Sequence, residues 1–429
     1  MKRFFGKTAI GAAVFFMTLT LLWLALFLSS LIPNEAIRVN MEKSVYSYAD
    51  RPAFAFTQGN RLNSVADHYA DAIWLNVAWN MGRGEPLRAC VQTQYYDGEE
   101  LGENAGLYYS VMENAEPNVD YTRYWHGTAL VIRLLSLFTT VEGMKIIGFS
   151  VFLLLVAVSL ALLLRLGYRD LAAALALSLA VVQIWNIRLS LEYQPAFIVT
   201  FALLPFYLLL ERKNDDWLAV LSIVGGTAVA FFDFLTTETV TVLLPLILVT
   251  AVRAKENRPI TAALLLKCGI CWGCAYAGTF LVKWTAAALV SHTDTFSAAL
   301  ASVQERTGST PADFIEPAVS FLSAPLANLA VLFGGAYRVD HGRVFTGIAV
   351  SLVVLLSVWY LLRNKTQKSA SAVLMLAVGS IVLLRFLLLN NHSYLHCFFT
   401  YRSLVSLIFA LLAALCLNIS LPQKKKRGR

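Results

Sequence analysis

Residues 61–80 read RLNSVADHYADAIWLNVAWN, and the interpretation of the whole chain is built on this stretch. Read as a helix, it places Asp67 and Asp71 four residues apart and therefore on one face. The opposite face carries apolar and aromatic residues, namely Val65, Tyr69, Ile73 and Val77. The pattern predicts an amphipathic helix that lies flat on a bilayer surface and holds its carboxylates at the water boundary.

The composition indicates a polytopic membrane protein. Of 429 residues, 58% are hydrophobic and only 14% charged, and the mean hydropathy is +0.62, which no ordinary soluble domain reaches. The net charge of +8 comes from short basic clusters between apolar runs and from a final cluster at 424–427. Cytoplasmic loops show such clusters under the positive-inside rule, so the charge does not indicate nucleic-acid binding.

Charge and hydropathy together predict about ten transmembrane helices with both termini in the cytoplasm. The first, uncleaved span is followed by spans near 144–164, 171–187, 195–210, 217–233, 236–252, 260–285, 344–362, 371–389 and 402–419. Counting 318–336 as another span would place the basic stretch RNKTQK outside, so this segment is interpreted as interfacial or re-entrant. The predicted organisation is an N-terminal span (1–32), an outer loop with interfacial helices (33–143), a transmembrane bundle (144–290), a second outer loop (291–343), C-terminal spans (344–419) and a basic tail (420–429).

This topology brings most of the unusual polar residues to the outer face. They are Asp67, His68, Asp71, Arg188, Glu192, Asp233, Glu238, Lys283, His392, His396, Tyr401 and Arg402, with Arg385 one helical turn below. Ionisable groups at membrane depth are costly and usually have a partner or a function.

Structural roles also fit several of these residues. The two carboxylates of 61–80 would also suit the solvated face of a surface helix, and Asp233 would suit a helix cap. His392 and His396 have metal-ligand spacing, but two histidines alone are weak support for a metal, so we expect none. Arg385 and Arg402 would also suit lipid-headgroup anchors.

Acids and cations that meet beneath a structured outer loop suit transfer from a lipid-linked phosphate donor. A carboxylate would act as general base on an acceptor hydroxyl, and Arg, Lys or His would stabilise the charge of the departing phosphate. A donor embedded in the bilayer also explains why the cations lie at headgroup depth.

With an acidic residue shortly after its first span, the chain resembles the GT-C superfamily of polyprenyl-phosphate-dependent glycosyltransferases. The segments RYWHG, FDFLTTE and NHSYLHCFFTYR also look like those of uncharacterised bacterial multi-pass proteins associated with cell-envelope polysaccharides. The resemblance implies inverting transfer of a monosaccharide from a polyprenyl-phosphate donor to a cell-envelope glycan or lipid-linked acceptor. It places the protein in the bacterial cytoplasmic membrane, with no cofactor beyond an optional divalent cation.

The same resemblance implies roles for individual residues. The general base would be Asp67, with Asp71 or Asp233 as the alternate. The donor-phosphate ligands would be Arg402, Arg385, His396 and His392, supported by His68, Glu238 and Tyr401. His68 would orient the base or, with Asp67, hold a divalent cation.

Three other functions stay open from the sequence. A transporter or flippase for lipid-linked glycans would use the same cations but needs polar groups through the whole membrane, where Lys267 is the main candidate. A polysaccharide polymerase would place basic residues in large outer loops, and the loop at 286–343 is long enough. A non-catalytic assembly subunit is the third. The sugar, acceptor, linkage and oligomeric state are not encoded in any recognisable pattern.

Overall fold

The structure is a computed structural model that describes residues 2–291, 294–308, 320–334 and 369–417, with seven residues between 345 and 356. The predicted span at 344–362 lies largely outside these residues, and the predicted tail at 420–429 lies wholly outside them. The fold is 77% helix and 3% strand, so the prediction of an all-α protein is confirmed.

Six of the described helices are long and apolar enough to cross a membrane, which indicates a membrane protein. They are Thr8–Ser30 within α1 (Lys2–Ser30), α7 (Val141–Arg165), α10 (Asp215–Phe232), α12 (Ala262–Ser291), Ala370–Leu388 within α16 (Ser369–Leu388), and Cys397–Cys416, which comprises α18 (Cys397–Thr400), η5 (Tyr401–Leu404) and α19 (Val405–Cys416). Three further predicted spans form shorter helices, namely α8 (Arg169–Val181), α9 (Pro195–Leu210) and α11 (Val240–Lys255). The described residues therefore do not reach a count of ten.

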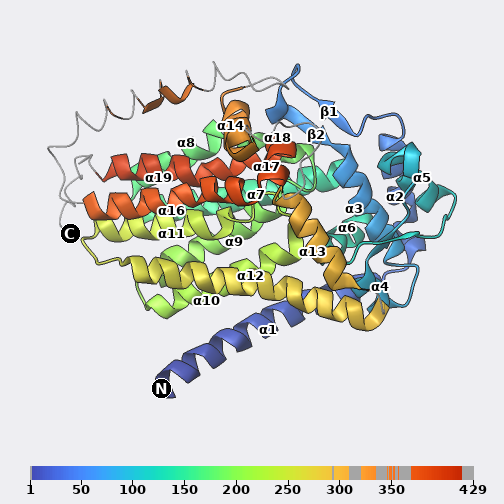
Figure 1. Cartoon of the computed structure of the whole chain (residues 1–429), viewed down its shortest axis with the longest axis horizontal. Coiled ribbons are helices and arrows are strands. Elements are labelled where there is room, and N and C mark those ends of the chain that lie inside the picture. Colours follow the sequence, from blue (N-terminus) through green and yellow to red (C-terminus); the bar gives the residue numbers. More distant parts are fainter. Residues whose placement is uncertain are drawn as a thin grey trace.

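Residues 33–140, here called the loop segment, join α1 to α7 and pack against one end of the bundle (Figure 1). Its helices are α2 (Asn34–Tyr48), η1 (Leu62–Ser64), α3 (His68–Asn80), α4 (Pro86–Gln92), η2 (Glu99–Leu101), α5 (Glu103–Met112) and α6 (Thr128–Ser136). Two antiparallel strand pairs complete it: β1 (Phe54–Phe56) with β2 (Val65–Asp67), and β3 (Gln94–Tyr95) with β4 (Val119–Asp120). The predicted structured outer loop thus exists as a folded layer.

Helix α3 differs from the prediction in its burial. It begins at His68, twelve of its thirteen residues are buried, and only Tyr69 is exposed. The prediction of an amphipathic helix lying on the bilayer surface is therefore wrong. The physical reason is that large apolar side chains such as Trp74 and Trp79 occur on every side of the helix, and a helix that is apolar all round is buried.

A buried arginine fixes α3 to the first span. Arg133, in α6, is fully buried, and its Nε donates to the carbonyl of Ser29 at 2.9 Å. Its Nη1 donates to Asn34 Oδ1 at 3.0 Å and to the carbonyl of Ala78 at 2.6 Å. These acceptors include free carbonyls near the C-terminal ends of α1 and α3, which a cation satisfies well. The position of α3 is thereby set from the membrane span.

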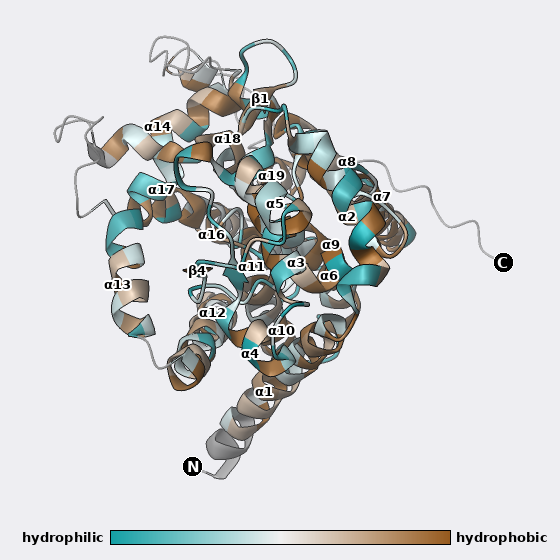
Figure 2. Ribbon diagram, turned by 90° about the vertical axis from the view of Figure 1, so that its right-hand side faces the viewer, coloured by the Kyte–Doolittle hydropathy of each residue, from teal (hydrophilic) through white to brown (hydrophobic). Residues whose placement is uncertain are grey.

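Four short elements complete the end of the bundle that carries the loop segment: η3 (Ile184–Leu189), α13 (Thr295–Arg306), α14 (Ser320–Leu332) and α17 (Asn390–Leu395). Figure 2 looks toward this end and shows α3 near the centre, with α13 and α17 on one side and α7 on the other. Side chains from the loop segment and from the ends of the spans therefore converge around α3.

Candidate functional site

Asp67 lies at the junction of β2 and α3. It pairs across the sheet with Phe54, and its Oδ1 accepts a hydrogen bond from the backbone N–H of Ala70 at 2.9 Å, so it is the N-cap of α3. The side chain is 3% exposed. Burial raises the pKa of Asp67 from 3.8 to about 7, and the nearby charge of Asp71 adds to this, against the Ala70 hydrogen bond. One carboxylate oxygen has no hydrogen-bond partner among the described residues.

Asp71 has a different environment, because both of its oxygens are occupied. Oδ2 accepts from Tyr48 and forms an ion pair with Lys145, each at 2.9 Å. Oδ1 accepts from the Ser190 hydroxyl and from the backbone N–H of Leu191, each at 2.8 Å. Asp71 therefore joins α2, α3, α7 and the chain after η3. A carboxylate with four donors is poorly suited to take a proton from an acceptor.

Glu192 was predicted to lie at the outer face, but no role was predicted for it. It is 7% exposed, and no described residue donates a hydrogen bond to its carboxylate. Burial raises the pKa of Glu192 well above its usual value, and the charges of Asp67, Asp233 and Asp71 raise it further. Three carboxyl groups, from α10's C-terminal turn and from the start of α3, thus lie within electrostatic reach of Glu192. Mutual repulsion of this kind is typical of acid–base sites.

The segment FDFLTTE, after α10, forms a compact turn. Asp233 accepts from the backbone N–H of Thr236 at 2.9 Å and also from its hydroxyl. Burial and the neighbouring Glu238 raise the pKa of Asp233 to about 7. Glu238 itself forms a bidentate ion pair with Arg385, with Nε–Oε1 at 2.9 Å and Nη2–Oε2 at 3.0 Å. The guanidinium of Arg385 is thus occupied by contacts with this turn, and Glu238 neutralises its charge.

Arg402 is the predicted phosphate ligand that lacks an acidic partner. It is fully buried, and it donates two long hydrogen bonds, to the carbonyls of Asn63 (3.3 Å) and Phe398 (3.4 Å). Its Nε has no partner among the described residues. The guanidinium lies 4.7 Å from the ring centroid of Tyr193, whose hydroxyl donates to the carbonyl of Val65 at 3.2 Å. A single tyrosine ring therefore joins Arg402 to the strand that ends at Asp67.

His392 and His396 lie together, with ring centroids 4.7 Å apart. The Nδ1 atoms of both are buried without partners in the described part of the chain, and so is Nε of Arg306, the last residue of α13. Burial lowers the pKa of His396 to about 4, and Arg306 and Arg385 lower it further. Burial also lowers the pKa of His392, and both rings lie beside Arg306, a cation that forms no ion pair among the described residues. The cluster is electropositive and offers free hydrogen-bonding atoms.

The segment RYWHG packs the loop segment onto the bundle. Trp125 Nε1 donates to the carbonyl of Thr279 in α12 at 2.8 Å, and the N–H of Gly127 donates to the carbonyl of Phe231 at 2.9 Å. A Cβ at Gly127 would approach the Phe231 ring within 2.2 Å, so only glycine fits there. The motif thereby fixes the end of α10 and the Asp233 turn that follows it.

The two remaining predicted supporting residues have contacts outside the acid cluster. His68 Nδ1 lies 2.8 Å from the carbonyl of Pro52, and burial lowers the pKa of this histidine. Tyr401 donates to the carbonyl of Val182 at 3.0 Å and packs beneath Arg402. Neither contact involves Asp67.

Within the described residues, no three His, Cys, Asp or Glu side chains are grouped in a way that could hold a metal ion. The acid cluster contains four carboxyl groups, but Asp71 and Asp233 use their oxygens for the contacts described above. Comparison of the chain with protein-family models, with curated proteins and with solved structures gave no match. The function is therefore inferred from the geometry of the site.

Proposed function

We propose that the protein is a membrane glycosyltransferase. It would transfer a monosaccharide from a polyprenyl-phosphate donor to a cell-envelope glycan or lipid-linked acceptor at the outer face of the bacterial cytoplasmic membrane. The proposal includes the GT-C-like topology with about ten spans and both termini cytoplasmic. The observation that carries it is that Tyr193 contacts both Arg402, a buried guanidinium with no acidic partner among the described residues, and β2, the strand that ends at the buried carboxylate Asp67.

In the proposed reaction Asp67 accepts the proton of the acceptor hydroxyl. The acceptor oxygen forms a bond to the anomeric carbon from the face opposite the phosphate, the bond from that carbon to the phosphate oxygen breaks, and the anomeric centre is inverted. The electron pair of the broken bond leaves with the phosphate, whose charge Arg402 and the His392–His396 pair would stabilise. A pKa of about 7 suits this role, because a general base works best when its pKa lies near the operating pH.

The contacts also support a division of labour among the other acids. Asp71 fixes α3 to the elements around it and Asp233 holds its own turn, while burial raises the pKa of Glu192 and so favours its protonated form. A protonated Glu192 would be a hydrogen-bond donor toward the sugar or the acceptor. No step in this scheme requires a metal, and a divalent cation remains an option for the donor phosphate.

The test is complementation of a strain that lacks the gene by Asp67→Asn, with Asp50→Asn as a matched control on the exposed end of the same loop segment. Each variant is quantified in the membrane, and the envelope glycan is analysed by mass. We expect Asp67→Asn to leave the glycan short of one sugar and Asp50→Asn to restore it. A wild-type glycan from a strain with Asp67→Asn would exclude Asp67 as the general base and would overturn the proposal.

A further inference from the structure

A cavity of about 360 Å³ lies between α3, α6, α7 and α9. Its lining is almost entirely apolar and includes Trp74, Val131, Met144, Val151, Leu191 and Ile198. An apolar cavity of about 150 Å³ already takes up benzene, so this one has room for several carbons of a chain. Neither the acid cluster nor the cations described above use this space.

The mouth of the cavity opens on the apolar side of the bundle. Val131 in α6 and Ile147 and Val151 in α7 all line it, and they are 44%, 40% and 42% exposed. Helix α7 is among those long and apolar enough to cross a membrane. Residues that are both exposed and apolar on such a helix face hydrocarbon, so the cavity is accessible from the bilayer.

Two residues of the cavity lining, Trp74 and Leu191, are close in the chain to acids of the cluster. Trp74, one turn after Asp71, is 2% exposed, and its indole Nε1 has no hydrogen-bond partner in the described part of the chain. Leu191 lines the same space, and the next residue along the chain is Glu192. A buried N–H left unpaired costs about 1–3 kcal/mol, and a ligand oxygen would satisfy it.

We propose that this cavity holds the hydrocarbon chain of a lipid-linked acceptor, whose head-group oxygen accepts a hydrogen bond from Trp74. The inference rests on the proposed function and narrows its acceptor to a lipid. His392 lies in α17 and His396 directly follows it, and α17 lies on one side of α3, whereas the cavity lies on the α7 side (Figure 2). A chain in the cavity would therefore present its head group to the acids from the side opposite this histidine pair.

The experiment uses the full-length protein in phosphatidylcholine nanodiscs and a single-chain C16 alcohol that carries a diazirine near its hydroxyl end. After illumination, labelled peptides are identified by mass spectrometry. We expect label on 128–135, 144–151 and 191–199. Val151→Trp fills the cavity and should lower this labelling at least tenfold, equivalent to 1.4 kcal/mol. Leu154→Trp also introduces a tryptophan on α7, at a residue that is 64% exposed and does not line the cavity, so it should leave the labelling unchanged.

Equal labelling of the two tryptophan variants, or label confined to peptides outside the cavity, would overturn the lipid site. Transfer to a water-soluble acceptor that proceeds unchanged in Val151→Trp would overturn the lipid acceptor while leaving the glycosyltransferase intact. Conversely, the cavity could be labelled while the Asp67→Asn variant restores a wild-type glycan. That result would support the lipid site and overturn the proposed reaction. Trp74→Phe provides an independent test, since it keeps the apolar ring but should weaken labelling by removing the N–H.

Discussion

Replacing Asp67 by Asn should make the protein more stable at alkaline pH while abolishing its activity. The asparagine Oδ1 still accepts from the N–H of Ala70, so the cap of α3 is retained. The substitution removes a buried negative charge that lies beside Asp71 and Glu192. A residue whose task is only to cap the helix would instead give no change or a loss of stability.

The magnitude follows from the pKa of Asp67. A rise from 3.8 to about 7 is roughly 3 units at 1.36 kcal/mol each, so the ionised carboxylate costs the folded state at most about 4 kcal/mol. Burying the replacement amide costs about 1–3 kcal/mol in turn, which leaves a net gain of about 1–3 kcal/mol above pH 7.

The sign of the pH dependence is fixed by linkage. The folded state holds its proton more tightly than the unfolded state, so the wild-type protein is most stable below pH 4 with respect to this group and loses that stability as the pH rises to about 7. The stabilisation of Asp67→Asn over wild type should therefore be complete at pH 8 and shrink steadily toward pH 4.

The assay is thermal unfolding in detergent at several pH values and one fixed scan rate, because membrane proteins often unfold irreversibly. We expect a midpoint roughly 2–10 °C above wild type at pH 8, with Asp50→Asn unchanged. A midpoint that falls at pH 8, or a shift that does not depend on pH, would refute the idea that burial holds this carboxylate near neutral pKa.

Three further predictions follow from the site. Lys145→Met should lower the unfolding midpoint strongly, because breaking its buried ion pair with Asp71 costs about 3–5 kcal/mol. Arg51→Met breaks an exposed ion pair and should cost only about 0–1 kcal/mol. Similar losses of stability in the two variants would contradict a structural role for the Lys145–Asp71 pair. Arg402→Lys should lower kcat about 10²-fold in a reconstituted transfer assay, because lysine lacks the planar fork; an unchanged kcat would exclude Arg402 as a phosphate ligand. The wild-type rate should rise with pH through about 7 as Asp67 loses its proton, so a flat pH–rate profile from pH 5 to 9 would exclude it as the base.

The sequence was sufficient to place a helix within 61–80 and a folded layer after the first span, because both depend on local patterns, but the first part of the predicted helix was wrong, since residues 62–67 form η1 and β2. It did not show that α3 is buried, since that depends on partners such as Arg133 and Ser190, which are distant in the chain. The Glu238–Arg385 pair joins residues 147 apart, so no local pattern marks Arg385 as neutralised.

Glu192 illustrates a different limit of sequence reasoning. It stands in LEYQP between two apolar runs, where a carboxylate is usual in a solvated loop. The structure instead folds η3 against β2 and joins Ser190 and Leu191 to Asp71 of α3, which buries the side chain of Glu192 and brings three other carboxyl groups near it. An ionisable residue within three positions of a proline that begins an apolar helix is the available signal, and it is weak.

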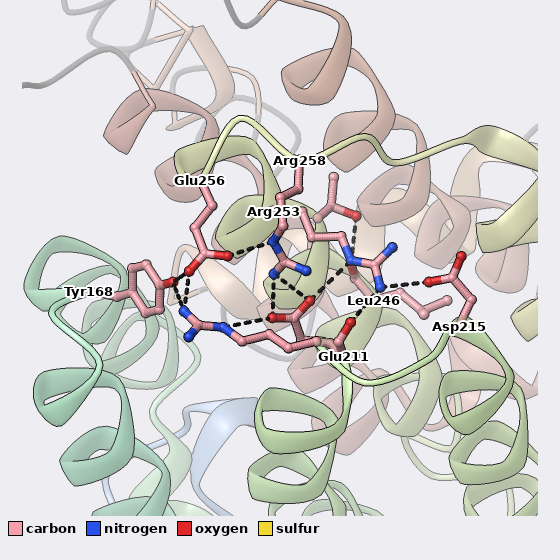
Figure 3. A network of polar contacts seen from close by, with 9 residues as sticks. Tyr168, Glu211, Asp215, Leu246, Arg253, Glu256 and Arg258 are labelled. Atoms are coloured by element: carbon pink, nitrogen blue, oxygen red, sulfur yellow. Dashed lines mark hydrogen bonds and ion pairs between the residues drawn. The ribbon is translucent and has the colours of Figure 1, made fainter.

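The two ends of the bundle differ in how their buried charges are paired. At the end opposite the loop segment, Glu211 pairs with Arg253 and Arg258, Glu256 pairs with Arg258 and Arg212, and Asp215 pairs with Arg253, so three acids match three arginines (Figure 3). Such a network holds helix ends together.

At the other end the described acids and bases are only partly matched. Asp71 and Glu238 have cationic partners, whereas Asp67 and Glu192 form no ion pair among the described residues, and neither does Arg402. Burying a charge without a partner costs free energy, and the network at the opposite end of the bundle avoids this cost. The two ends are about 24 Å apart, which is the length of the sixteen-residue helix α9 that runs between them. Folding alone does not require this arrangement, since matched pairs were available to the same bundle. A substrate that brings both a proton and a negative charge would complete it, which is what an acceptor hydroxyl and a donor phosphate supply together.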